Sequence, residues 1–463
     1  MADNPGWDMI SSSGIGESSE ERRLLQQGKP SYDDDDDDSE SHTGYGITTA
    51  SIFVVAAVAG TGVLVLPNAL AKTGWSGLIV LVTVCVIQIY TGVLLGRCWS
   101  ILQERFEIYR RQTRNPYPAI GYEAFGAIGR ILVTLTIDVS VIGICVVFLL
   151  IISENATILF GLDDFPYCYK LAITAALLCP FTWFGTPKDF WFIGLAGALS
   201  TGFACILLLI KMFRDLPTVI DDNVNYTGQD YVSYFSGVGI MIVAFNGHMS
   251  FPTIQHDMAE PSKFPSSLIL AGIIVAFYFL PMAIVGFYVY GDVLYQEENI
   301  FDVVGGGFEP TVALVLITLH VITAFVILGN PVFQDVEDIL GIEMTFTWKR
   351  IVVRSSFVIL MWFLAATIPS FAHILSFLGG TSFLALAFIY PVCCYCKLTL
   401  TGCPTKSWIS ESFSVSEVII FATILILGIF IAASTTYADF SLVGSELYLN
   451  FSRPCYLPMI TGH

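Results

Sequence analysis

The chain has 463 residues, of which 55% are hydrophobic and 13% are charged, and its mean hydropathy is +0.71. About a quarter of the residues of a soluble domain are charged, so this composition excludes an ordinary soluble protein and predicts an all-α polytopic membrane protein. The formal net charge of −18 belongs mainly to one end of the chain, because residues 1–46 hold twelve Asp or Glu against three Lys or Arg.

Residues 1–46 are predicted to form a disordered, acidic cytosolic tail. The acidic run at residues 33–38, with Ser and Gly around it, cannot bury a hydrophobic core. Within the tail, Glu-Glu-Arg-Arg-Leu-Leu resembles the acidic dileucine signal, in which Glu20, Leu24 and Leu25 would recruit sorting adaptors for endosomes and lysosomes. The alternative is a solvated tail without a specific partner. Because these residues are polar, no cleavable signal peptide is predicted.

Residues 47–438 are predicted to form a transmembrane domain of eleven helices, because apolar stretches long enough to cross about 30 Å of hydrocarbon recur along this range. Their centres lie near residues 58, 86, 140, 176, 200, 243, 277, 320, 359, 384 and 426. The fourth stretch, residues 167–183, is the shortest. Residues 439–463 are predicted to form a C-terminal tail on the lumenal or extracellular side.

The distribution of basic residues predicts that the N-terminus is cytosolic. In that orientation most of the 21 Lys and Arg lie on the cytosolic side, as the positive-inside rule requires. The three Asn-x-Ser/Thr sequons then lie on the opposite side. Asn225 and Asn450 are the predicted glycosylation acceptors, since Asn155 lies too close to the membrane. Cys168 and Cys455 are predicted on that same side, where the topology allows a disulfide between them.

Glycine and proline interrupt the first and the sixth predicted helix. The first contains Gly60, Gly62 and Pro67, and the sixth contains Gly247 and Pro252. A break leaves backbone amides and carbonyls unpaired, and these are tolerated at membrane depth only where they line a protein cavity. Amides at the start of a half-helix favour a carboxylate, and carbonyls at the end of another favour an ammonium group. Close packing or simple kinks are the alternative, but two breaks at equivalent places favour a site for a zwitterion.

Four parts of the chain resemble the amino acid/auxin permease family. The first is Ala-Gly-Thr-Gly-Val-Leu-Val-Leu-Pro at residues 59–67, followed by Ala-Lys-Thr-Gly-Trp at residues 71–75. The others are Gly-Tyr-Glu-Ala-Phe-Gly at 121–126 with Gly-Arg at 129–130, Phe-Asn-Gly-His at 245–248 with Phe-Pro-Thr-Ile at 251–254 and Met258, and Asn-Pro-Val-Phe at 330–333 with Val-Glu at 336–337. The glycine-histidine pair in the sixth helix is similar to the vesicular and vacuolar branch of the family.

The resemblance implies a fold of the leucine-transporter type, with five-plus-five inverted repeats, broken helices 1 and 6, and an eleventh helix at the edge. It implies secondary active transport of amino acids, usually coupled to protons on endomembranes and sometimes to sodium. Carried onto this chain, the substrate-binding residues of the first and sixth helices are Gly60, Thr61, Gly62, Phe245, Asn246 and Gly247.

Proton coupling requires a titratable group within the membrane, and the sequence offers Asp138, His248 and His320. An intramembrane carboxylate is costly, which makes Asp138 a functional candidate. Imidazole titrates between cytosolic and organelle pH. Each of these side chains can instead be a structural hydrogen-bonding group. Thr318 and Thr323 are the candidates for binding sodium if the coupling ion is not a proton.

The leading interpretation is a proton-coupled carrier of neutral amino acids on a lysosomal, endosomal or vesicular membrane, with the amino acid, protons and membrane lipid as its partners. The alternatives are an amino-acid sensor that signals through the acidic tail and a sodium-coupled carrier at the plasma membrane. A channel is disfavoured, because no repeated filter motif is present. No nucleotide-binding, zinc-hydrolase or nucleophile motif indicates an enzyme, and no cofactor, metal or nucleic-acid partner is expected.

Overall fold

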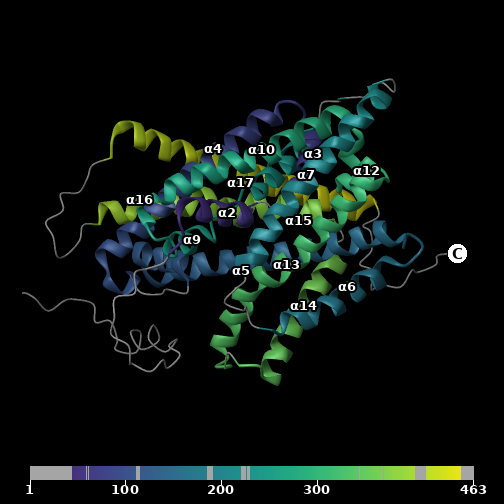
Figure 1. Cartoon of the computed structure of the whole chain (residues 1–463). Helices are drawn as coiled ribbons and strands as arrows, with labels where there is room; N and C mark the ends of the chain where they lie inside the picture. The colour runs from purple at the N-terminus through teal and green to yellow at the C-terminus, as the bar shows by residue number, and fades with distance from the viewer. Residues whose placement is uncertain are drawn as a thin grey trace, which may run out of the picture. The chain divides into compact units, whose positions relative to one another are not determined.

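The computed structural model describes the chain from residue 44 to residue 449 with short gaps, and these residues belong to one unit that begins at Gly44 (Figure 1). The described ranges are 44–58, 60, 62–110, 115–184, 191–220, 226, 230–343, 345–368, 370–401 and 413–449.

The described chain is helical almost throughout. Its first half contains α2 (Ile47–Val58), α3 (Gly62–Thr73), α4 (Gly77–Arg105), the short 3-10 helix η1 (Glu107–Arg110), α5 (Pro116–Phe160), α6 (Tyr167–Thr182) and α7 (Trp191–Ile220). Then follow α8 (Tyr231–Ala244), α9 (Phe251–His256), η2 (Pro261–Lys263), α10 (Phe264–Tyr290), α11 (Val293–Gln296), α12 (Ile300–Val304), α13 (Phe308–Ile339) and α14 (Trp348–Thr367). The chain continues through α15 (Phe371–Leu378), the π-helical turns η3 (Gly379–Phe383) and η4 (Ala385–Ile389), α16 (Tyr390–Leu400) and α17 (Val415–Leu449).

The helix lengths agree with a polytopic membrane protein. Within the described ranges, eight helices are long and apolar enough to span a bilayer, and the bent pair α2–α3 makes a ninth. Two further apolar helices are shorter, α6 with 16 residues and α8 with 14. All eleven predicted centres lie in helical segments. The all-helical fold is therefore confirmed, while the count of eleven spans stays a prediction that depends on these two short helices.

Two features of the helices were not predicted from the sequence. The backbone of Gly126 has a φ of 68°, which favours glycine, and it divides α5 into an initial arm and a longer spanning part. The resembling motif that leads into the third span therefore forms a kink. At the other end, α17 continues to Leu449, past residue 438, where the predicted transmembrane domain ends.

The other helices pack around two half-helices: α3, which follows the first break, and α8, which precedes the second. Helix α3 packs against α8 and α10, α13 packs against α5 and α7, and α17 packs against α8. Every residue of α3 is buried. The hydroxyl of Ser376 on α15 donates to the Asp439 carboxylate on α17 at 2.6 Å, which fixes the last helix to the bundle.

Candidate functional site

The first predicted helix is broken where the glycines occur. Helix α2 ends at Val58 and α3 begins at Gly62, and the two axes differ by 58°. The amide of Gly60 donates to the carbonyl of Val58 at 2.8 Å, so the chain turns tightly between the halves. Thr61 and Ala59 lie outside the described residues. The first amides of α3 have no partner within the helix, as at any helix start.

The sixth predicted helix is broken in the same way. Helix α8 ends at Ala244, and α9 begins only at Phe251. Two carbonyls that the break frees at the end of α8 have found partners. The carbonyl of Ile242 accepts from the side-chain amide of Gln88 on α4 at 2.8 Å, and that of Val243 accepts from the backbone amide of Asn246 at 3.0 Å.

The two breaks touch each other. A Cβ atom added at Gly62 would lie 2.8 Å from the Cα of Ala244, the last residue of α8. A Cβ added at Gly247 would lie 2.7 Å from Cγ2 of Val58, the last residue of α2. Real Cβ atoms do not approach other atoms this closely. A side chain at Gly62 would have to displace the backbone of Ala244, and one at Gly247 would have to displace the side chains of Val58 and Phe251. Folding therefore places the end of α8 against the first break and the end of α2 against the second break.

The predicted substrate residues do not all face the same way. Gly60 has no heavy atom within 4 Å of where a Cβ would stand, so open space lies beside it. The ring of Phe245 packs against Phe279 of α10, with 5.3 Å between ring centres. The side-chain amide of Asn246 donates to the carbonyl of Phe383 at 3.0 Å, and its oxygen accepts from the backbone amide of His248 at 3.2 Å. Asn246 thus fixes the break to η3.

A small apolar cavity lies beside the breaks. Among its lining residues are Val58, Gln88, Phe245 and Val275, which belong to or follow α2, α4, α8 and α10. It has room for about one water molecule. Because an amino acid needs more space, a substrate can enter this region only if the surrounding helices move apart.

His248 lies directly in the second break and is fully buried. Its Nε2 is 3.0 Å from the Thr91 hydroxyl on α4, and its ring centre is 4.9 Å from that of Phe251. Of the three predicted proton-coupling residues, His248 is the one that folding brings beside the breaks.

The other predicted coupling residues lie elsewhere in the bundle. His320 on α13 packs directly against Gly197 on α7. A Cβ atom added at Gly197 would lie only 2.3 Å from Nδ1 of His320. Asp138 is partly buried on α5, within electrostatic range of Asp335 on α13. The two candidate sodium ligands already donate to helix carbonyls, Thr318 to Leu314 at 2.7 Å and Thr323 to His320 at 2.8 Å.

Comparison with known proteins identifies the family. The family model described as "Transmembrane amino acid transporter protein" matches residues 43–437. The chain belongs to this family. The match confirms the resemblance seen in the sequence and covers both breaks.

Several plant members of the amino acid transporter family are similar to this chain. Amino acid transporter AVT1E of Arabidopsis thaliana is 27% identical over 362 residues, which are 73% of this chain and 64% of the relative. AVT1D from the same plant is 25% identical over 401 residues, 84% of this chain and 68% of the relative. The chain thus spans about two thirds of the length of these relatives, which are transporters and not enzymes.

A solved structure shows the same fold. MhsT, crystallised in complex with L-phenylalanine, aligns with a TM-score of 0.55 at 12% identity, covering 86% of this chain and 99% of that one. At this identity the likeness concerns the fold alone.

Several predicted sites of this family member lie outside the described residues, namely Glu20, Leu24, Leu25, Asn225 and Asn450. They stay predictions. The structure does describe two other residues considered in the sequence analysis, Asn155 and Cys168.

The third sequon residue, Asn155, is fully buried, donates to Thr318 and accepts from Asn299. Cys168 is disulfide-bonded, and the eight other cysteines of the described residues are free. Its pairing with Cys455 stays a prediction, because that residue lies outside the described ranges.

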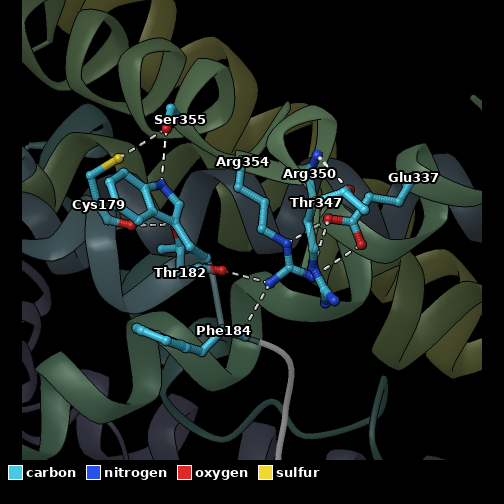
Figure 2. Close-up of polar contacts among 9 residues, drawn as sticks. Cys179, Thr182, Phe184, Glu337, Thr347, Arg350, Arg354 and Ser355 are labelled. Carbon is cyan, nitrogen blue, oxygen red and sulfur yellow. Dashed lines mark hydrogen bonds and ion pairs between the residues drawn. The ribbon is translucent and has the colours of Figure 1, made fainter. Parts of the chain in front are cut away.

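A buried ion cluster that the sequence did not predict joins α6, α13 and α14 (Figure 2). Arg354 donates to both oxygens of Glu337, at 2.5 and 3.1 Å, and its third nitrogen donates to the carbonyls of Thr182 and Phe184 at the end of α6. Arg350 contributes a second cation, 3.3 Å from Glu337. All three charged side chains are at most 4% exposed.

The cluster joins the end of α6 to the end of α13 and the start of α14, which lie more than 150 positions further along the chain. A carboxylate that meets a guanidinium through two parallel bonds is held in one orientation, and cationic groups suit the carbonyls at a helix end. In the sequence, Glu337 stood out only as part of the family motif. Arg350 and Arg354 entered only the count of basic residues that predicts the membrane orientation. Their pairing was not predictable, because it depends on how α13 and α14 pack.

Proposed function

We propose that this protein is a secondary active transporter that carries a neutral amino acid between the two breaks. The observation that carries the proposal is the contact between them, Gly62 against Ala244 and Gly247 against Val58. The start of α3 supplies unpaired amides for the substrate carboxylate. The open space at Gly60 allows a ligand to approach the backbone.

The side chains at the breaks support a neutral substrate. Residues 58–62 and 244–250 contain no Asp, Glu, Lys or Arg, so apart from His248 these positions offer no partner for a charged side chain. Phe245 and the apolar cavity beside it supply hydrophobic surface. Burying an unpaired charge there would be costly, and a neutral side chain avoids that cost.

We propose that a proton is the coupling ion and that His248 binds it. His248 is the titratable residue of the second break and is connected to α4 through Thr91. Protonation would replace a neutral ring by a cation next to the substrate site, which gives the substrate and the proton a means of influencing each other. Asp138 and His320 remain secondary candidates. The hydroxyls of Thr318 and Thr323 already donate to helix carbonyls, which makes sodium binding there the weaker alternative.

We further propose that the N-terminus is cytosolic and that the protein works in a lysosomal, endosomal or vesicular membrane. The arginine-rich connections between the spans support the orientation, and the dileucine pattern at Glu20, Leu24 and Leu25 supports the location.

Uptake into vesicles tests the function. The purified full chain is reconstituted into liposomes, a pH gradient is imposed without sodium, and radiolabelled amino acids are screened. We expect accumulation of one or more neutral amino acids that collapses when a protonophore removes the gradient. Accumulation that requires sodium would favour the plasma-membrane type of carrier. Tight amino-acid binding without any flux would contradict transport and favour a sensor.

A further inference from the structure

A short segment closes one face of the membrane domain. Residues 291–307, which we call the lid, connect α10 to α13 and contain α11 and α12. The lid packs against α3, α7 and α13. Three of its apolar side chains, Leu294, Ile300 and Val304, are at most 2% exposed, while Val293 faces outward. The lid therefore has to leave this position before the half-helix α3 becomes accessible from this face.

Neutral side chains hold the lid at two points. The Asn68 amide on α3 donates to the carbonyls of Leu294 and Glu297 at 2.7 and 3.2 Å. The Asn299 amide donates to the Asn155 side-chain oxygen on α5 at 3.1 Å, and both residues are fully buried. These bonds involve amides, so they do not depend on pH.

A third attachment of the lid involves an acidic side chain. The carboxylate of Glu298 accepts from the Ser370 hydroxyl and from the backbone amide of Ala372, the latter at 3.1 Å. Both donors lie at the start of α15, where a negative charge is favoured.

The fourth attachment joins two acidic side chains. Glu154 on α5 and Asp302 on α12 are hydrogen-bonded to each other. Two ionised carboxylates have no hydrogen to donate, so this bond exists only while the pair holds a proton. The Asp302 side chain is exposed at the surface of the lid, so the proton can be exchanged with the solution on that side.

The surroundings of this pair are acidic. Although Asp302 reaches the solvent, neighbouring protein removes part of its water and raises its pKa above the ordinary value. The bond from Glu154 lowers the pKa of Asp302, and the charges of Glu297 and Glu298 raise it further. Glu298 on the lid and Tyr167 on α6 are further titratable groups that act on Glu154.

Basic side chains on the neighbouring elements have other partners. Lys211 pairs with Asp215, Arg214 pairs with Glu309, and Lys72 acts on Asp439. Among the described residues, no group of three His, Cys, Asp or Glu is arranged to hold a metal ion either. A proton is therefore the cation that this pair is suited to bind.

We propose that Glu154 and Asp302 form a proton-operated latch, which holds the lid on α5 while the two carboxyl groups share a proton and releases it when the proton leaves. The latch goes beyond the proposed function. Its purpose rests on that function: it would make substrate access from the lid face depend on the pH of the solution on that side of the membrane.

The direction of the effect follows from linkage. The closed lid binds the proton more tightly than the open lid, because only the closed lid brings the two carboxyl groups together. Closure is therefore favoured while the pair holds its proton and is lost as the pH rises and the proton leaves. A difference of one pKa unit between the closed and open states changes their ratio about tenfold.

Electron-spin distance measurements test the latch. Nitroxide labels are attached at Val293→Cys on the lid and Phe160→Cys at the end of α5, two exposed positions, in the full chain without its other free cysteines. We expect one short distance at pH 5 and a second, longer distance at pH 10, where the shared proton has left. Glu154→Gln keeps a neutral hydrogen-bond donor, so it should hold the short distance at both pH values. Asp302→Asn, which makes the same change on the lid side, should do the same.

A matched control separates the latch from a general loss of surface charge. Glu309→Gln removes a carboxylate from the first turn of α13, just beyond the lid, and should keep the full pH response. An unchanged distance between pH 5 and pH 10 in the native pair, or a full response in both Glu154→Gln and Asp302→Asn, would overturn the latch. The distances are measured without substrate. A responsive lid in a protein that moves no amino acid would therefore contradict the transport function alone, and uptake with a lid that ignores pH would contradict the latch alone.

Discussion

Gly62 and Ala244 bring the two broken helices into contact, since a Cβ at Gly62 would lie 2.8 Å from the Cα of Ala244. Gly60, only two residues earlier, has no heavy atom within 4 Å of its own Cβ position. The two glycines of the same motif therefore have different roles. Gly62 allows two half-helices to pack, and Gly60 leaves space beside the break.

Gly60→Ala is the sharpest test of the substrate site. The added methyl group meets no protein atom, so folding should be unaffected, but it enters the space where the substrate backbone is expected. Overpacking a site costs about 1–3 kcal/mol, which weakens affinity about 5- to 150-fold. Radioligand binding to the purified protein measures this change.

Two other glycines serve as controls for that substitution. Gly62→Ala should lower the unfolding temperature, because its Cβ would overlap Ala244. Gly306→Ala adds a methyl group to an equally open position in the lid and should leave affinity unchanged. A Gly60→Ala protein that binds substrate with native affinity would exclude Gly60 from the site.

The breaks were predictable because glycine and proline act locally. Gly62 and Gly247 lie where the sequence placed the interruptions, and Pro252 lies in the first turn of α9, where a missing amide costs nothing. Pro67 differs, because it lies inside α3 and packs against Gly286 of α10. The sequence thus predicted where the helices break but not which proline stands at a helix start.

Side-chain directions were not predictable, because they depend on partners far along the chain. Asn246 was expected to face the substrate, yet its side-chain amide donates a hydrogen bond to the carbonyl of Phe383, which is 137 positions away. Glu154 carried no sequence signal, since its partner Asp302 belongs to a lid whose position is set by tertiary packing. Periodicity and motifs describe one helix at a time, and these contacts join helices.

His248→Gln tests proton coupling. Glutamine can still hydrogen-bond Thr91 but cannot titrate near neutral pH. One pH unit is worth about 1.4 kcal/mol for each coupled proton, or about tenfold accumulation. We expect the variant to lose accumulation driven by a pH gradient while it still exchanges labelled for unlabelled amino acid at equal pH.

The matched variant for this test is His320→Gln, because His320 is buried in the bundle away from the breaks. It should retain accumulation. Gradient-driven accumulation at the native level in His248→Gln would exclude His248 and direct attention to Asp138.

Glu337→Gln should strongly destabilise the protein. The substitution leaves Arg350 and Arg354 buried without their carboxylate, and breaking a buried ion pair costs about 3–5 kcal/mol. Thermal unfolding in detergent, followed by tryptophan fluorescence, measures the loss. Glu260→Gln is the control, because its partner Lys263 and Glu260 itself are exposed, and such pairs contribute at most about 1 kcal/mol. Equal unfolding temperatures for the two variants would contradict a stabilising role for the cluster.

The three sequons should behave differently in a glycosylating host. Asn155 is fully buried and both ends of its amide are hydrogen-bonded, to Thr318 and Asn299, so an oligosaccharide transferase cannot reach it in the folded protein. Asn225 and Asn450 are the expected acceptors. Asn225→Gln and Asn450→Gln should each increase electrophoretic mobility, with no further shift after glycosidase treatment of the double variant.

Asn155→Gln should leave the mobility unchanged and should instead loosen the lid. The spin-label measurement would report this as a population with a longer distance at pH 5. A mobility shift from Asn155→Gln would mean that this end of α5 is exposed, and the attachment of the lid to α5 would then have to be abandoned.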